Sequence, residues 1–322
     1  MKAIRPSQHG GAELLTLSEL PTPSPGPGQL LVKVAVAGVN FIDVYQRTGL
    51  YKTELPIPLG LEGGGVVEAL GTGVTTARVG ERVVWSGVPG SYATHTLVPA
   101  EKAVPVPEGL DLERATAVLL QGMTAHYLAH DTFPLRPGHV ALIHAAAGGT
   151  GLLLVQLAKR AGARIIGTVS TDEKAALARK AGADEIILYR SQEVEVEVRR
   201  LTQGRGVDVV YDSVGASTFQ HSLKSLKPRG YLVLFGQSSG PIGTIDPQIL
   251  SANGSLFLTR PTLAHYTSTR DELLARAQDL FRLIAKGELD VKIARTLPLS
   301  EARAAHEALQ GRETSGKILL VP

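Results

Sequence analysis

The residues with the clearest chemical meaning lie in the middle of the chain, where an apolar run ends in small side chains. Residues 139–143 are followed by a histidine, three alanines and then Gly148, Gly149, Thr150 and Gly151. Such a turn between a strand and a helix lets the backbone approach a pyrophosphate, and the first N–H groups of the helix face the anion. In the dinucleotide fingerprint G-x-G-x-x-G, alanine replaces the first glycine here, and the other two are present. The turn therefore predicts a dinucleotide site. The alternative is that the glycines only let helix and strand pack closely.

The segments around this turn alternate between strand and helix patterns. Apolar runs typical of buried strands recur at 164–169, 185–188, 207–211 and 231–235, and helix patterns occupy 152–161 and 172–180. This alternation predicts a doubly wound parallel sheet. Residues 193–201 fit two patterns, because their valines alternate as in a strand while the fold needs a crossover helix there. We predict the helix.

The kind of dinucleotide should be decided at the end of the second strand of this sheet. NAD sites place a carboxylate there for the ribose 2′-hydroxyl, whereas this chain has Ser170, Thr171 and Lys174. Hydroxyls and an ammonium group suit a 2′-phosphate, so we predict NADPH over NADH, although Asp172 and Glu173 would oppose a phosphate. Ser170 and Glu173 also fit a helix capping box, which would leave Lys174 as a solvated helix residue.

Two further strand ends belong to the same edge of the predicted sheet. Ligands of doubly wound sheets bind at the carboxyl ends of the strands. The fourth strand ends at Ser213 and Val214, and the fifth ends at Phe235, Gly236, Gln237 and Ser238. We expect both loops to contact the cofactor.

Composition limits the remaining possibilities. The 322 residues suffice for two domains, and the absence of cysteine excludes disulfides, thiolate metal sites and a cysteine nucleophile. The 33 basic and 30 acidic residues are interspersed, which argues against a nucleic-acid partner. We find no signal-peptide pattern and no run of roughly 20 apolar residues that could span a membrane. A cytoplasmic protein without a membrane partner is expected.

The two ends of the chain differ from its middle. Short β-rich runs separated by Pro and Gly occupy 30–38, 64–70, 82–85 and 92–98, which predicts a compact antiparallel barrel. A helix is expected over 112–128. After the nucleotide domain, helix patterns at 270–286 and 300–309 and a strand at 317–321 are too few to form a domain. We predict three segments, namely 1–122 as the first part of the barrel domain, 123–262 as the dinucleotide domain and 263–322 as a return segment that completes the barrel.

Five motifs together carry a family resemblance over essentially the whole chain. They are residues 38–43 (GVNFID), 60–65 (GLEGGG), 121–125 (QGMTA), 144–151 (HAAAGGTG) and 211–215 (YDSVG). The combination resembles the ζ-crystallin-like quinone oxidoreductases of the medium-chain dehydrogenase/reductase superfamily. The resemblance implies a GroES-like β-barrel domain and a Rossmann domain, with the nicotinamide held in a cleft between them.

The chain departs from the zinc alcohol dehydrogenases of the same superfamily at the metal ligands. Where those enzymes place a cysteine and a histidine it has Asn40 and Phe41, and where they have Gly-His-Glu it has residues 60–62, GLE. A catalytic zinc needs three protein ligands, and Asp43 with Glu62 does not make a plausible set. We therefore predict no metal. Without a Lewis acid, hydride transfer to an electron-poor acceptor is favoured over alcohol oxidation.

The resemblance also implies roles for individual residues. It places Asn40, Asp43, Tyr45, Thr124 and Tyr127 around the nicotinamide and its ribose, Tyr51 in the substrate cleft, Ser170, Lys174 and Tyr189 at the 2′-phosphate, and Arg312 near the cofactor. Tyr45 and Tyr51 are the candidate catalytic residues, and the Tyr51 phenol could orient or protonate a quinone oxygen. The alternatives are ordinary cleft or core aromatics for the tyrosines and a surface salt bridge for Arg312.

The resulting prediction is a zinc-independent NADPH:quinone reductase. Reduction of α,β-unsaturated carbonyl compounds is the alternative within the enzyme class, and a nucleic-acid-binding or structural crystallin-like role is the alternative of another class. The family also implies a homodimer in which the edge strand near 255–259 pairs with its copy.

Overall fold

The computed structural model describes residues 1–322. The chain forms two compact units. The first unit comprises Met1–Met123 and Thr267–Pro322, and the second unit comprises Thr124–Tyr266. None of the helices combines the length and the apolar character that a membrane crossing requires.

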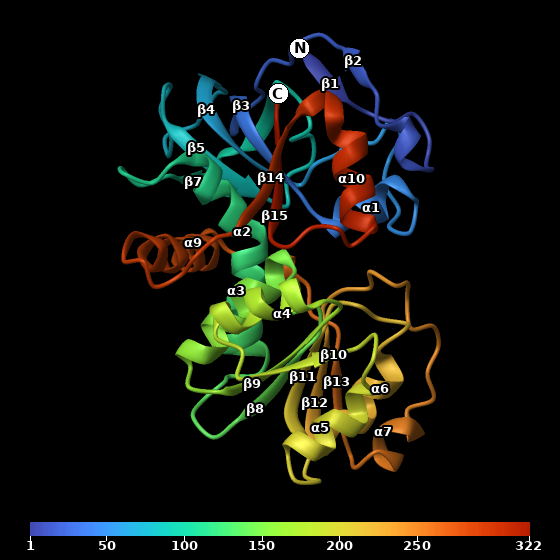
Figure 1. Ribbon diagram of the computed structural model, residues 1–322. Helices are drawn as coiled ribbons and strands as arrows, with labels where there is room; N and C mark the ends of the chain where they lie inside the picture. The colour runs from blue at the N-terminus through green and yellow to red at the C-terminus, as the bar shows by residue number, and fades with distance from the viewer. The chain divides into compact units, whose positions relative to one another are not determined.

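The second unit is built on a six-stranded parallel sheet (Figure 1). Its strand order is β10, β9, β8, β11, β12, β13, so the chain starts in the middle of the sheet, moves out to one edge and then crosses to the other side. This is the doubly wound topology that the sequence predicts. The strands are β8 Val140–Ile143, β9 Arg164–Val169, β10 Glu185–Leu188, β11 Val207–Asp212, β12 Leu226–Leu234 and β13 Phe257–Thr259.

Helices cover both faces of this sheet. Helix α3 packs against α4 and α5 packs against α6, and the two pairs lie on opposite faces (Figure 1). The ambiguous segment forms the predicted crossover helix, because Val194 and Val198 are buried one turn apart against the sheet. The helices are α3 Gly149–Arg160, α4 Asp172–Ala181, α5 Val194–Leu201, α6 Phe219–Ser225, α7 Gln248–Ala252 and α8 Leu263–Tyr266.

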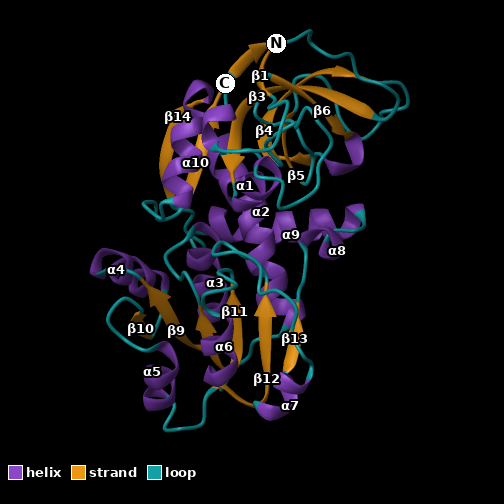
Figure 2. Cartoon of the chain, turned by 90° about the vertical axis from the view of Figure 1, so that its right-hand side faces the viewer, coloured by secondary structure: helices purple, strands orange, loops and turns teal.

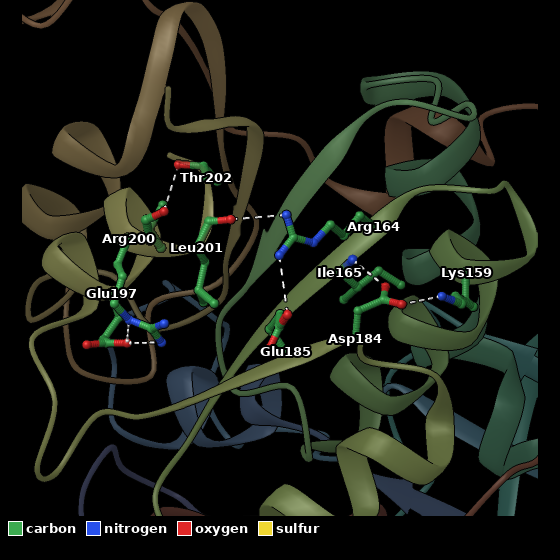
Figure 3. Close-up of polar contacts among 10 residues, drawn as sticks. Lys159, Arg164, Ile165, Asp184, Glu185, Glu197, Arg200, Leu201 and Thr202 are labelled. Carbon is green, nitrogen blue, oxygen red and sulfur yellow. Dashed lines mark hydrogen bonds and ion pairs between the residues drawn. The ribbon is translucent and has the colours of Figure 1, made fainter. Parts of the chain in front are cut away.

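The amino ends of β9 and β10 are fastened by polar contacts (Figure 3). Asp184 accepts a hydrogen bond of 2.8 Å from the Ile165 N–H and pairs with Lys159 at the end of α3. Arg164 donates to the Leu201 carbonyl oxygen at 3.1 Å. Side chains at this edge therefore hold helices to the sheet. The carboxyl ends of the same strands lie at the opposite edge, where a doubly wound sheet binds its ligand.

The first unit holds a seven-stranded sheet and a separate two-stranded pair (Figure 2). Its main order is β14, β15, β3, β4, β5, β7, with β6 paired to β3, and only β14 and β15 are parallel. The last strand of the chain therefore pairs with a strand of its first third. The strands are β1 Lys2–Ile4, β2 Leu17–Glu19, β3 Gln29–Val39, β4 Glu62–Leu70, β5 Arg82–Ser86, β6 His95–Pro99, β7 Val104–Pro105, β14 Ile293–Pro298 and β15 Lys317–Val321.

Four helices accompany the first unit. They are α1 Phe41–Arg47, α2 Leu112–Tyr127, which continues into the second unit, α9 Arg270–Ala285 and α10 Ala302–Gln310. Helix α10 packs its apolar face on a core that contains Ile57, Leu59 and Ile318. Helices α2, α9 and α10 confirm the predicted patterns within a few residues.

Several elements differ from the sequence prediction. Helix α1 was not predicted, because seven residues are too few to show a period. Strand β14 was also missed, since its side chains are half-buried or exposed and show no apolar alternation. Strand β12 begins five residues before the predicted start, and it runs through Pro228 and Gly230 with a shift in its pairing to β11.

Candidate cofactor and substrate sites

The glycine turn that was predicted to bind a pyrophosphate joins β8 to α3. Gly148 is the N-cap residue and no side chain caps the helix, so its first N–H groups have no partner within it. A Cβ at Gly151 would lie 2.2 Å from the Ala145 carbonyl oxygen, so only glycine allows the helix to start this close to the strand. Free N–H groups and the positive end of α3 together fit a phosphate group.

The residues predicted at a 2′-phosphate gather at the ends of β9 and β10. Ser170 directly follows β9, and Tyr189 directly follows β10, the neighbouring strand. The Tyr189 N–H donates to the Val169 carbonyl oxygen at 3.2 Å, which fixes the two strand ends side by side. Lys174 is half-buried in the first turn of α4, and Tyr189 is 38% exposed. These side chains lie on one edge of the sheet.

The capping box predicted for Ser170 and Glu173 is wrong. Helix α4 begins at Asp172, so its N-cap residue is Thr171, whose Oγ1 accepts a hydrogen bond of 3.4 Å from the Lys174 N–H. The hydrogen bond from Thr171 lowers the pKa of the Glu173 carboxyl. Glu173 therefore keeps its negative charge beside Lys174, which, as the sequence analysis noted, would oppose a phosphate group there.

The loops after β11 and β12 are joined to each other. The Phe235 N–H donates to the Asp212 carbonyl oxygen at 2.9 Å, and the Ser238 N–H donates to the Ser213 carbonyl oxygen at 3.2 Å. Gly236 packs so closely that a Cβ there would meet the Ser213 carbonyl oxygen at 2.6 Å. The predicted residues of both loops thus form one half-buried rim at the carboxyl edge of the sheet: Ser213, Val214, Phe235, Gly236, Gln237 and Ser238.

In the first unit, Asn40 belongs to a buried cluster that includes an ion pair. Its Oδ1 accepts from Lys317 Nζ at 2.8 Å and from Gln121 Nε2 at 3.2 Å, and its Nδ2 donates to Glu62 Oε2 at 2.9 Å. Lys317 forms an ion pair with Glu62, and both side chains are at most 1% exposed. The carboxamide of Asn40 is therefore held in one orientation by three side chains from distant parts of the sequence.

Asp43 starts a second buried series of hydrogen bonds. Its Oδ2 accepts from the Asn40 N–H at 2.8 Å and from the Tyr92 hydroxyl at 3.2 Å. Tyr92 in turn contacts His306 Nε2 at 3.0 Å, and His306 Nδ1 contacts Arg47 Nη1 at 3.2 Å. Because a guanidinium only donates, His306 Nδ1 accepts and Nε2–H donates to Tyr92, whose hydroxyl then donates to Asp43. The series joins α1 to α10.

Burial moves the pKa values of Asp43 and His306 in opposite directions. It raises the pKa of Asp43 from 3.8 to about 7, and, with the charge of Arg47, it lowers the pKa of His306 from 6.5 to about 3. The folded state therefore holds a proton on Asp43 between pH 4 and 7 that the unfolded state has released, so this group's contribution to stability is lost as pH rises. The contribution of His306 is present above pH 6.5 and is lost as pH falls.

These opposing effects lead to a prediction for His306→Gln. An amide at 306 can accept from Arg47 and donate to Tyr92, so the series survives while its titratable imidazole is removed. Both proteins keep Asp43, so the difference between them is the contribution of His306, which wild type gains as the pH rises from 4 to 6.5. At about 1.4 kcal/mol for each pKa unit, the free energy of unfolding of the variant should fall by roughly 3–4 kcal/mol relative to wild type over this range, measured in urea at each pH. If the free energy of unfolding changed with pH in the same way in both proteins, His306 would not have the lowered pKa given above.

The other predicted residues lie in different surroundings. Tyr45 and Tyr51 are neighbours in the first unit, with ring centroids 5.2 Å apart. In the second unit Tyr127 is 1% exposed and stacks on Tyr266 at 4.2 Å, and Thr124 is half-buried one turn earlier in α2. Arg312 is exposed just after α10 and has a φ of 58°, in the left-handed region.

The residues present do not fit a tetrahedral zinc site. No group of three or more His, Cys, Asp or Glu side chains is arranged to hold a metal. Glu62, which with Asp43 is what remains for a metal in this frame, already pairs with the Lys317 ammonium group. An ammonium group beside Glu62 would repel a second cation.

Sequence reasoning missed the buried partners of the first unit. Lys317 was assigned only to a terminal strand, and Tyr92 and His306 had no assigned role. A lysine at the start of an otherwise buried strand, and a histidine on the apolar face of an amphipathic helix, are signals that could have indicated buried polar partners.

Known proteins resemble this chain over its full length. Residues 26–108 match the family model for the alcohol dehydrogenase GroES-like domain, and residues 149–281 match that for zinc-binding dehydrogenases. A quinone oxidoreductase of Pseudomonas aeruginosa is 45% identical over 100% of this chain and 99% of its own. A 2-haloacrylate reductase of a Burkholderia species is 46% identical over 97% of this chain and 96% of its own.

A solved structure adds the fold and a bound nucleotide. The Escherichia coli quinone oxidoreductase in complex with NADPH superposes with a TM-score of 0.97 at 41% identity, covering 100% of both chains. The GroES-like and Rossmann folds that the motifs implied are thus confirmed. The chain belongs to the quinone oxidoreductase family of the medium-chain dehydrogenase/reductase superfamily.

Proposed function

We propose that this protein transfers reducing equivalents from NADPH to quinones without a zinc ion. One structural observation carries the proposal: no side chain caps the start of α3, and Gly151 in its first turn has no Cβ to hold the helix away from the strand, as a pyrophosphate site needs. Full-length similarity to quinone oxidoreductases supports the choice of acceptor. When bound, NADPH supplies a hydride, and the acceptor takes up a proton as well.

The proposed cofactor and substrate contacts are those expected from the resemblance. In the second unit the α3 turn holds the pyrophosphate, and Ser170, Thr171, Lys174 and Tyr189 hold the 2′-phosphate. The rim residues 213–214 and 235–238 also contact the cofactor. The remaining proposed contacts are Asn40, Asp43, Thr124, Tyr127 and Arg312 for the cofactor and Tyr45 and Tyr51 for the substrate. The division at residues 122 and 262 into a barrel domain, a dinucleotide domain and a return segment is likewise a proposal.

The preference for NADPH leads to a prediction for Lys174→Ala. The variant should raise the Michaelis constant for NADPH by about 10- to 100-fold, because a charge-assisted contact to the 2′-phosphate is lost, and should leave that for NADH nearly unchanged. Lys180→Ala, at the exposed far end of the same helix, is the matched control and should change neither constant. Equal effects of Lys174→Ala on both cofactors would exclude a contact to the 2′-phosphate.

The acceptor class is tested by parallel assays. Anaerobic oxidation of NADPH is followed with a benzoquinone, a naphthoquinone and a simple enone. Faster turnover of the quinones supports the proposal. Turnover of the enone alone would favour the alternative, to which the similarity with a 2-haloacrylate reductase also points. Tight NADPH binding without turnover of any acceptor would indicate a binding or structural role.

A homodimer formed through β13 is also part of the proposal. This strand is the edge of the six-stranded sheet, and Phe257 on it is 50% exposed while it stacks on Tyr231 at 4.5 Å. Pairing of β13 with its copy would remove an open edge from each subunit. The cytoplasm is the proposed location, and the absence of cysteine suits such a reducing compartment.

The dimer proposal predicts the effect of Phe257→Glu. Sedimentation velocity should give twice the 34.0 kDa chain mass for wild type and the mass of one chain for this variant, because a charged side chain on an edge strand opposes pairing with another strand. Phe257→Tyr keeps the ring and should remain dimeric. A monomeric wild type, or a dimeric Phe257→Glu variant, would contradict the arrangement.

A further inference from the structure

Asp212 is buried at the end of β11, at the edge of the sheet where the cofactor is proposed to bind. Its Oδ1 accepts from the N–H groups of Val214 and Gly215 at 2.8 and 3.0 Å. The Thr218 hydroxyl lies within 2.9 Å of both carboxylate oxygens. The backbone carbonyl of the same residue receives the Phe235 N–H. Asp212 therefore holds the loop after β11 by its side chain and the loop after β12 by its backbone.

The other side of the carboxylate faces a buried series of side chains. Ser222 Oγ donates to Asp212 Oδ2 at 2.8 Å and contacts His144 Nε2 at 3.0 Å. His144 Nδ1 contacts Thr168 Oγ1 at 3.0 Å. Asp212, Ser222, His144 and Thr168 are each at most 2% exposed. Asp212 lies on β11, Ser222 on α6 and Thr168 on β9, and His144 directly follows β8.

The chemistry of these groups fixes the direction of the hydrogen bonds. A carboxylate only accepts, so the Ser222 proton points to Asp212, and Ser222 Oγ must accept from His144 Nε2–H. His144 Nδ1 then accepts the proton of the Thr168 hydroxyl. Burial lowers the pKa of His144, which keeps the imidazole neutral with one N–H, as this arrangement requires.

We propose that Asp212 is a positioning residue for the cofactor: its carboxylate fixes the loop after β11, which carries the rim residues Ser213 and Val214, and sets the tautomer of His144 through Ser222. This inference rests on the proposed function, since it assigns the rim to the cofactor. It adds residues for which neither the glycine fingerprint nor the 2′-phosphate pocket gives a role. Neither residue contacts the cofactor in this proposal. Asp212 acts by holding the backbone of the loop after β11, and His144 acts by joining Ser222 to Thr168 near the end of β9.

A comparison along one strand separates positioning from general stability. Asp208, at the other end of β11, also has a carboxylate that accepts from a backbone N–H, that of Val140 at 2.7 Å, and it is 8% exposed. Asp208→Ala and Asp212→Ala should therefore both lower the melting temperature. Asp212→Ala alone should raise the NADPH dissociation constant, by about tenfold or more, when measured by calorimetric titration of the folded protein.

The conservative variant Asp212→Asn should largely restore NADPH binding. An amide keeps an oxygen for the Val214 and Gly215 N–H groups, and its NH₂ can donate to Ser222 if the whole series reverses. Nitrogen-15 spectra, assigned with a His144→Gln variant, should then show His144 protonated on Nε2 in wild type and on Nδ1 in Asp212→Asn. This measurement also tests the proposal if Asp212→Ala does not fold.

The outcomes are distinguishable from one another. If wild type does not bind NADPH, the proposed function fails. If wild type, Asp208→Ala and Asp212→Ala all bind NADPH with the same affinity, only the positioning role of Asp212 is overturned. It is also overturned if both alanine variants weaken binding equally, or if the His144 tautomer is the same in wild type and Asp212→Asn.

Discussion

Gly151→Ala should abolish NADPH binding at ordinary assay concentrations. The new Cβ would stand 2.2 Å from the Ala145 carbonyl oxygen and 3.0 Å from the Ala146 carbonyl carbon. Both are backbone atoms, so relief requires the start of α3 to move away from β8. Because a displacement of about 1 Å in a binding site can cost 10²-fold, the NADPH dissociation constant should rise at least that much, measured by calorimetric titration.

Gly122→Ala is the control for the general effect of adding a methyl group at a tightly packed glycine. A Cβ at Gly122 in the first unit would meet Val118 Cγ2 at 2.7 Å and Leu280 Cδ1 at 3.1 Å, both of them side-chain atoms. Gly122→Ala should therefore lower stability by about 1–3 kcal/mol or less and leave the affinity for NADPH unchanged. Full NADPH affinity in Gly151→Ala would mean that the pyrophosphate does not depend on this turn.

Lys317→Met should cause the largest loss of stability among single substitutions in the buried cluster. Glu62 would be left without its counter-charge at 0% exposure. Removal of one partner of a buried ion pair typically costs about 3–5 kcal/mol. The free energy of unfolding in urea at pH 7 should fall by that amount.

The double variant Glu62→Gln with Lys317→Met should recover much of this loss. The new amide at position 62 would still accept from the Leu120 N–H, which lies 2.7 Å from Glu62 Oε1. The Asn40 amide can then turn over, so that its oxygen accepts from the NH₂ of the new amide. If the Gln121 amide turns over as well, the Asn40 NH₂ donates to Gln121 Oε1, which is buried without a partner in the native arrangement. A double variant that is no more stable than Lys317→Met would show that charge pairing is not the source of the loss.

The fold was predictable where one local pattern decided each element. The central strands β9 and β11 are buried on both faces and appear as continuous apolar runs, and the glycines after β8 mark the only strand-to-helix turn of that kind. Helix α5 was correctly predicted because the alternation of the fold outweighed the period-two valines. Short or exposed elements such as α1 and β14 gave no comparable signal.

The partners of the site residues were less predictable than the residues themselves. Asn40 and Lys317 are 277 positions apart, and nothing local to either one indicates the other, because β15 must first pair with β3. Similarly, the cap of α4 is Thr171 rather than Ser170, a difference of one residue that only the start of the helix decides. Long-range pairing and the ends of helices are what one sequence alone leaves open.

The most direct measurement of the central claim is the anaerobic rate of NADPH oxidation by a naphthoquinone, with the protein stripped of metal and chelator present throughout. The absorbance of NADPH is followed with and without protein, and then again after an excess of zinc is added. We predict rapid oxidation that requires the protein and does not increase with zinc. Absence of protein-dependent oxidation, or activity that returns only when zinc is restored, would contradict a zinc-independent NADPH:quinone reductase.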